Sequence, residues 1–280
     1  MLHCFELNIT NKDSGFWLDQ KLNYSIGDFK GKIKDLITEC AKKDGSTIEI
    51  YEHRDLLDNW FPESGCHIFI SHSHADKNVA ISIANELYSR FGIKSFIDSE
   101  FWGFVDDAIH EINTFHSKVN GRDDLLEYNK SMRVASNFYL MLSNALTDGI
   151  YNSDSCFFIK TDNSLPLQAD GSEKDEGTLS PWIYTEINYT STVALTPHPD
   201  RPKPVILEKA SKNFSLEGFE NYTADRALQI AYRPKRDHMV KVDEGAVITT
   251  IFGSPKTKEE DRDNNTIFND LDKIYARFLR

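Results

Sequence analysis

A tryptophan and a glutamate stand four positions apart at the start of an expected helix. Ser180 is suited to cap the free amides of that helix, and Pro181 follows at the first helical position, where its missing N–H costs nothing. Residues four apart share one helix face, which places Trp182 beside Glu186. An indole next to a carboxylate can hold a flat cationic ring and a sugar hydroxyl together.

A second group of polar residues follows an apolar strand. The apolar run 68–70 stops at Ser71 and His72, so a buried strand is expected to deliver polar side chains to one end of a sheet. The next expected strand ends at Asp98, and Trp102 follows in the loop. In open α/β sheets, ligands bind beyond the carboxyl ends of the strands, so we expect the chemistry at this edge.

Structural interpretations of these residues remain open at this point. Glu186 fits an ordinary solvated carboxylate, and Trp182 fits core packing as well as a pocket wall. Asp98 could only cap a turn. Trp102 fits either a core aromatic or a part of a loop that gates a site.

Composition excludes several functional classes. The net charge of −12 disfavours binding to nucleic acid, and the short basic group 233–236 is expected to be a solvated loop. The apolar runs are too short to cross a membrane, and the N-terminal sequence lacks the pattern of a secretory signal. The four cysteines show no zinc or CxxC spacing, which predicts reduced thiols in a cytoplasmic protein. His72 and His74 resemble half of a metal site, but we expect no metal because no further ligand stands at a suitable spacing.

Strands and helices alternate after residue 65, which predicts a parallel sheet flanked by helices. Residues 1–64 are expected to form a small N-terminal α+β extension, and the polar segment 113–133 an insertion in the domain 65–280. In the extension, the pattern predicts a strand over 5–9, a helix over 33–41 and a strand over 47–51. In the main domain, it predicts strands over 67–70, 93–97, 155–159, 204–207 and 227–232, and helices over 77–91, around 140–150, from 180 onward and over 266–278.

Four short motifs occur in an order that resembles one known family. They are residues 69–71 with Asp76, residues 96–98 with Trp102, residues 153–159, and Ser180 and Trp182 with Glu186. In this order they resemble the Toll/interleukin-1 receptor (TIR) domain, and most closely the bacterial TIR proteins of antiviral defence, of the Thoeris-like type. The resemblance implies a flavodoxin-like fold, and it covers roughly residues 65–280.

The resemblance also implies an activity, which is cleavage of the bond between nicotinamide and ribose in NAD. The glutamate that carries this activity corresponds to Glu186, with Trp182 shaping the pocket and Ser71 and His72 lining its floor. NAD is then the substrate, and no cofactor is implied. The products are ADP-ribose or a cyclic ADP-ribose isomer, which a separate effector protein could read as a signal.

Two alternatives of other classes stay open. The chain could be a non-enzymatic TIR module that signals through TIR–TIR assembly, which would make it a homo-oligomer. It could also be a sensor that binds an ADP-ribose derivative without cutting it. Glu186 in register with Trp182 favours the enzyme, because adaptor-type members need not keep that carboxylate.

Overall fold

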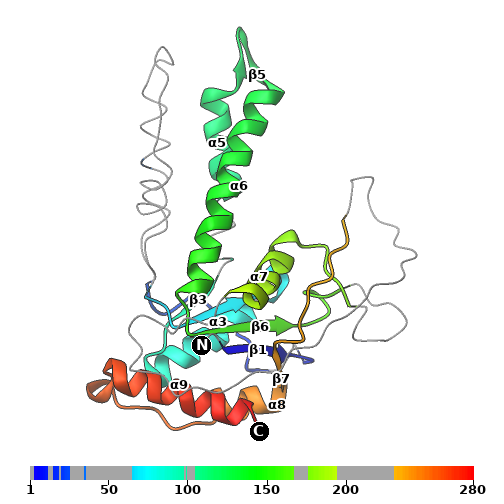
Figure 1. The fold of residues 1–280 in the computed structure, drawn as a ribbon. Helices are drawn as coiled ribbons and strands as arrows, with labels where there is room; N and C mark the ends of the chain where they lie inside the picture. Colours follow the sequence, from blue (N-terminus) through cyan, green and yellow to red (C-terminus); the bar gives the residue numbers. More distant parts are fainter. Residues whose placement is uncertain are drawn as a thin grey trace.

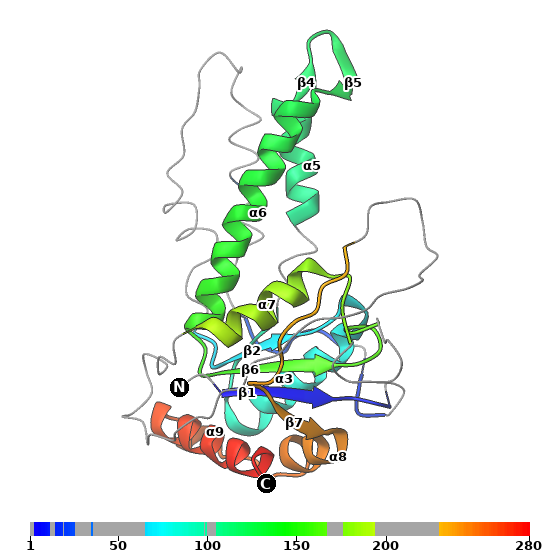
Figure 2. The same ribbon diagram turned by 45° about the vertical axis from the view of Figure 1, so that its right-hand side comes forward.

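A parallel sheet forms the centre of the protein. The computed structural model describes residues 3–11, 15–18, 20–25, 35, 65–97, 99, 105–166, 176–193 and 230–280. Within this part of the chain the sheet has five strands in the order β3-β2-β6-β1-β7, and every neighbouring pair is parallel (Figures 1 and 2). Their bounds are β1 His3–Asn8, β2 Ile68–Ser71, β3 Ser95–Ile97, β6 Ser155–Lys160 and β7 Val240–Asp243.

Helices cover both faces of the sheet, because the central strands are apolar on both sides. On one face, Leu7 and Ile70 pack into a core with α3 (Lys77–Phe91) and α9 (Asn264–Phe278). On the other face, Phe69 and Phe158 pack with α6 (Tyr128–Tyr151) and α7 (Pro181–Thr192). The prediction of a parallel sheet flanked by helices is therefore confirmed.

Several predicted elements form close to the expected positions. The helix predicted over 77–91 is α3, and Gly92 ends it with a φ of 73°, which glycine adopts without strain. The strands predicted over 67–70 and 155–159 are β2 and β6, and the last predicted helix is α9, capped by Asp263.

The first strand corrects the expected N-terminal extension. The alternating residues of β1 do form a strand, but it lies between β6 and β7 inside the main sheet rather than in a separate module. Its apolar residues Phe5 and Leu7 are buried because the helices α3 and α9 pack on that face of the sheet. The helix and strand predicted over 33–41 and 47–51 lie outside the described residues apart from residue 35, so the domain division at residue 64 otherwise stays a prediction.

The predicted insertion 113–133 belongs to a longer unit with regular secondary structure, which runs from α5 to α6. Helix α5 (Val105–His116) leads into a short antiparallel hairpin, β4 (Lys118–Val119) and β5 (Arg122–Leu126), and α6 returns to the sheet. Figures 1 and 2 show this unit as a long projection away from the sheet. The polar residues of 113–133 therefore form the tip of a helical hairpin.

The C-terminal part differs from the expectation in one strand. Of the strand predicted over 227–232, only residues 230–232 are described, and they contribute a single antiparallel bridge between Thr178 and Tyr232. The fifth strand of the sheet is β7 instead, followed by α8 (Glu244–Val247), the π-helical turn Ile248–Phe252 and the 3-10 turn Glu259–Asp261. The strand predicted over 204–207 lies outside the described residues.

The winding direction of the sheet reverses between β2 and β6. If β2 is taken as strand 1, then β3 is strand 2 and β6 is strand 3, so the order β3-β2-β6 matches the first three places of the flavodoxin-like order 2-1-3-4-5. The fourth place is taken by β1 and the fifth by β7. The sheet is compatible with that fold. Proteins of that fold bind ligands in a crevice where the winding direction reverses, and the corresponding place in this sheet, between β2 and β6, is called the crevice. Among the described residues, no helix combines the length and the apolar character needed to cross a membrane.

Candidate functional site at the carboxyl edge of the sheet

Ser71 and Glu186 meet at the point where the sheet reverses its winding direction. Ser71 is the last residue of β2, and Glu186 lies on α7, which crosses the same face of the sheet. The Ser71 hydroxyl donates a hydrogen bond of 2.5 Å to Glu186 Oε2. Both residues are buried, with 1% and 0% of their surfaces exposed. The structure therefore brings together two predicted site residues that are 115 positions apart.

The start of α7 explains why Glu186 points inward. The Ser180 hydroxyl accepts a hydrogen bond from the Ile183 amide, and Pro181 occupies the first turn. Ile183 and Ile187 pack into the core beneath the helix, which turns Glu186 toward the sheet as well. The interpretation of Glu186 as a solvated surface carboxylate is therefore wrong.

Burial gives this carboxylate an uncommon environment. Removing a carboxylate from water is costly unless hydrogen bonds compensate, and a hydroxyl donor compensates best when the acceptor is ionised. The Ser71 hydroxyl supplies one such bond, to Oε2, in surroundings of low dielectric constant. A fixed negative charge in such a medium interacts strongly with a positive charge that develops beside it.

Trp182 takes part in packing. It is half-buried, it contacts the core beneath α7, and its ring centroid lies 6.0 Å from that of Tyr139 on α6. The indole thus joins the projecting hairpin to α7, at one helical turn from Glu186. Its packing role is confirmed, and its role as a pocket wall stays a prediction.

His72 connects the loop after β2 to the loop after β3. Its Nε2 lies 2.8 Å from Ser99 Oγ, and the ring is 3% exposed. The predicted residues Asp98 and Trp102 lie outside the described residues, so their roles stay predictions. No cluster of three or more metal-ligating side chains occurs in the described part of the chain.

Asp76 fixes the loop after β2 against the loop after β6. Its two carboxylate oxygens accept hydrogen bonds from Thr161 Oγ1, at 2.5 Å, and from Asn163 Nδ2, at 2.7 Å. Asp76 is 2% exposed, so these bonds satisfy a carboxylate that water does not reach. The sequence placed Asp76 in a motif but gave it no role, and the structure shows that it holds the two sides of the crevice together.

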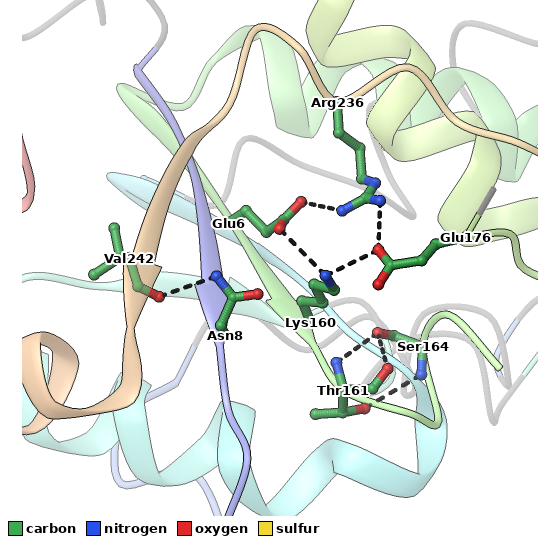
Figure 3. A network of polar contacts seen from close by, with 8 residues as sticks. All are labelled: Glu6, Asn8, Lys160, Thr161, Ser164, Glu176, Arg236 and Val242. Atoms are coloured by element: carbon green, nitrogen blue, oxygen red, sulfur yellow. Dashed lines mark hydrogen bonds and ion pairs between the residues drawn. The ribbon is translucent and has the colours of Figure 1, made fainter. Parts of the chain in front are cut away.

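Figure 3 shows an ion-pair cluster. It lies on the face of the sheet that carries Ser71, because Phe158 is in register with both Ser71 and Glu6. It consists of Glu6 on β1, Lys160 at the end of β6, Glu176 before α7, and Arg236 on the segment before β7. The prediction of a solvated loop over 233–236 is wrong for Arg236, whose side chain is 10% exposed. No local signal pointed to the cluster, because an alternating strand is expected to carry a polar residue such as Glu6 between Phe5 and Leu7.

Comparisons with known proteins add no assignment to this geometry. No protein-family model, curated protein or solved structure matches the chain.

Proposed function

We propose that the protein cleaves the nicotinamide–ribose bond of NAD, with Glu186 as the catalytic carboxylate. The observation that carries this proposal is the Ser71–Glu186 hydrogen bond in a buried position at the crevice between β2 and β6. The TIR-like motifs named above are the second support, because the glutamate of the motif is the one that lies at the crevice.

The reaction needs a negative charge close to the ribose. When the bond between C1′ and the nicotinamide nitrogen breaks, the electron pair leaves with nicotinamide and positive charge develops on the ribose, as in glycoside hydrolysis. Glu186 would stabilise that charge and accept a hydrogen bond from a ribose hydroxyl, while Ser71 would hold the carboxylate in place. Attack on C1′ by water yields ADP-ribose and a proton, and attack by the adenine or a ribose hydroxyl yields a cyclic isomer.

Access to the carboxylate has a structural condition. Because Glu186 has no exposed surface, a ribose reaches it only after a neighbouring side chain has moved. Binding would then exclude water from the reacting carbon, which suits both cyclisation and a strong electrostatic effect. Release of such a product as a signal in antiviral defence, read by an effector protein, belongs to the same proposal.

The test is nicotinamide release from NAD by the purified protein and by its Glu186→Gln variant. Glutamine keeps the shape and the acceptor oxygen for Ser71 but removes the charge, so we expect a loss of about 10²–10³-fold in turnover. Glu86→Gln is the matched control, because Glu86 pairs with Arg90 on α3, on the opposite face of the sheet. Equal turnover by the wild type and Glu186→Gln would refute the assignment.

The same assay separates the enzyme from the two alternative classes. A purified wild type that releases no nicotinamide, but binds ADP-ribose in calorimetry, would be a sensor. A wild type that does neither and grows in size in light scattering would be an assembly module.

A further inference from the structure

The ion-pair cluster beside the crevice holds two cations and two carboxylates away from water. The exposed fractions of the side chains are 1% for Glu6, 16% for Lys160, and 10% for both Glu176 and Arg236. Burying four charges is costly, and such clusters are often no more stable than apolar packing of the same volume. A contribution to stability alone is therefore a weak explanation for this cluster.

One oxygen of Glu176 lies between the two cations. Glu176 Oε2 lies 2.9 Å from Lys160 Nζ and 2.6 Å from an Arg236 Nη atom (Figure 3). An ammonium and a guanidinium that converge on one anionic oxygen form the arrangement that proteins use to bind phosphate. Glu176 occupies the position that a phosphate oxygen would take.

Glu6 shows that the present pairing is incomplete. Its Oε2 pairs with the other arm of Arg236, whereas its Oε1 finds no hydrogen-bond partner among the described residues. Lys160 Nζ is 3.8 Å from this Oε1, which is too long for a hydrogen bond, because the ammonium is closer to Glu176. A buried carboxylate oxygen in a native protein is normally satisfied, so this one calls for an explanation.

The cluster lies close enough to Glu186 for one nucleotide to reach both. Phe158 of β6 is in register with Ser71 on one side and with Glu6 on the other, so these residues form one row across three strands. Two strand spacings separate Ser71 from Glu6, which is about 10 Å. Lys160 stands two residues beyond Phe158, on the same face and nearer the carboxyl edge.

We propose that Lys160 and Arg236 form a binding site for a phosphate group of a nucleoside diphosphate, and that Glu176 occupies this site until the nucleotide displaces it. With Glu176 displaced, two cations and Glu6 leave one net positive charge, which matches the single negative charge of each phosphate in a diphosphate diester. The assignment of this nucleotide as NAD depends on the proposed function, whereas the anion site does not.

The position of Glu176 makes displacement possible without unfolding. Arg236 stays paired with Glu6. The segment 230–239 stays attached to α7 through the Thr190–His238 hydrogen bond of 2.8 Å, and to the residues before α7 through the Thr178–Tyr232 bridge. Glu176 precedes that bridge by two residues, so its side chain can turn away while the bridge remains.

The experiment measures binding of inorganic pyrophosphate by calorimetry, without NAD. Glu176→Gln removes the competing charge, so we expect pyrophosphate to bind about tenfold more tightly than to the wild type. Lys160→Met removes one cation and leaves Glu6 paired with Arg236, so we expect binding about tenfold weaker. Glu86→Gln and Lys273→Met are the controls, since they change charged pairs on α3 and α9, on the other face of the sheet.

The outcomes separate this inference from the proposed function. If neither Glu176→Gln nor Lys160→Met changes the affinity, or if no variant binds pyrophosphate at millimolar concentration, the anion site is refuted. If Glu176→Gln does not fold, as judged by circular dichroism, the loss of affinity in Lys160→Met decides alone. The same shifts measured in a Glu186→Gln background test the anion site whether or not Glu186 cleaves NAD.

Discussion

The hydrogen bond between Ser71 and Glu186 can be tested independently of any activity. Replacing Ser71 by alanine removes a hydrogen-bond donor to Glu186 Oε2, at a position where both residues are buried. A hydrogen bond to a charged group contributes about 1.5–3 kcal/mol, and the group left behind stays buried. We therefore expect Ser71→Ala to lower the free energy of unfolding by about 2 kcal/mol.

A double-mutant cycle isolates this bond from other effects of the substitution. In a Glu186→Gln background the acceptor is neutral, so Ser71→Ala should cost only about 1 kcal/mol. Urea unfolding, analysed by linear extrapolation, gives the four free energies. If Ser71→Ala costs the same in both backgrounds, the hydroxyl does not interact with an ionised Glu186, and the electrostatic argument for the site fails.

Three further predictions concern contacts that hold the frame of the site. Burial raises the pKa of Tyr24 far above its ordinary value, and its hydroxyl bonds both the carbonyl and the amide of Ser95 on β3, so Tyr24→Phe should cost about 1–3 kcal/mol in urea unfolding. Asp76→Ala should lower the free energy of unfolding by about 2 kcal/mol in the same assay, because it removes the acceptor of the Thr161 hydroxyl. Asp124→Ala is the control and should cost little, because the Asp124 side chain is exposed. The pKa of Glu244 lies below its ordinary value: partial burial raises it, but hydrogen bonds from the amide of residue 11 and from both the amide and the hydroxyl of residue 10 lower it more. Its contribution to stability is thus present above the unfolded pKa of about 4.3 and is lost as the pH falls through the lower pKa of the folded state. The difference in melting temperature between the wild type and Glu244→Gln should therefore shrink progressively as the pH falls below about 4.3.

Local sequence patterns predicted the helices that are defined by apolar periodicity and by terminal capping residues. The helix α3 has an apolar stripe and a terminal glycine, and α9 repeats apolar residues at helical spacing, so both were placed within two residues. The cap at Ser180 likewise predicted α7 and the helix face that carries Glu186. These elements follow from interactions between near neighbours in the sequence.

Elements that depend on distant partners were missed or misplaced. The sequence of β7, Val-Lys-Val-Asp, is too short and too polar to stand out, and it forms because β1 offers an unpaired edge. The place of β1 in the sheet depends on β6 and β7, which no local pattern reveals. The ion-pair cluster was missed for the same reason, since its four members come from four separate segments.

The place of β1 sets a limit on when this protein can finish folding. The ribosome makes residues 3–8 long before residue 243, yet the strand that ends at residue 243 lies along one edge of β1, and Asn8 bonds Val242 across 234 positions. Contacts of such large sequence separation are slow to form. Until residues 240–243 have been made, β1 can pair along its β6 edge but not along its β7 edge.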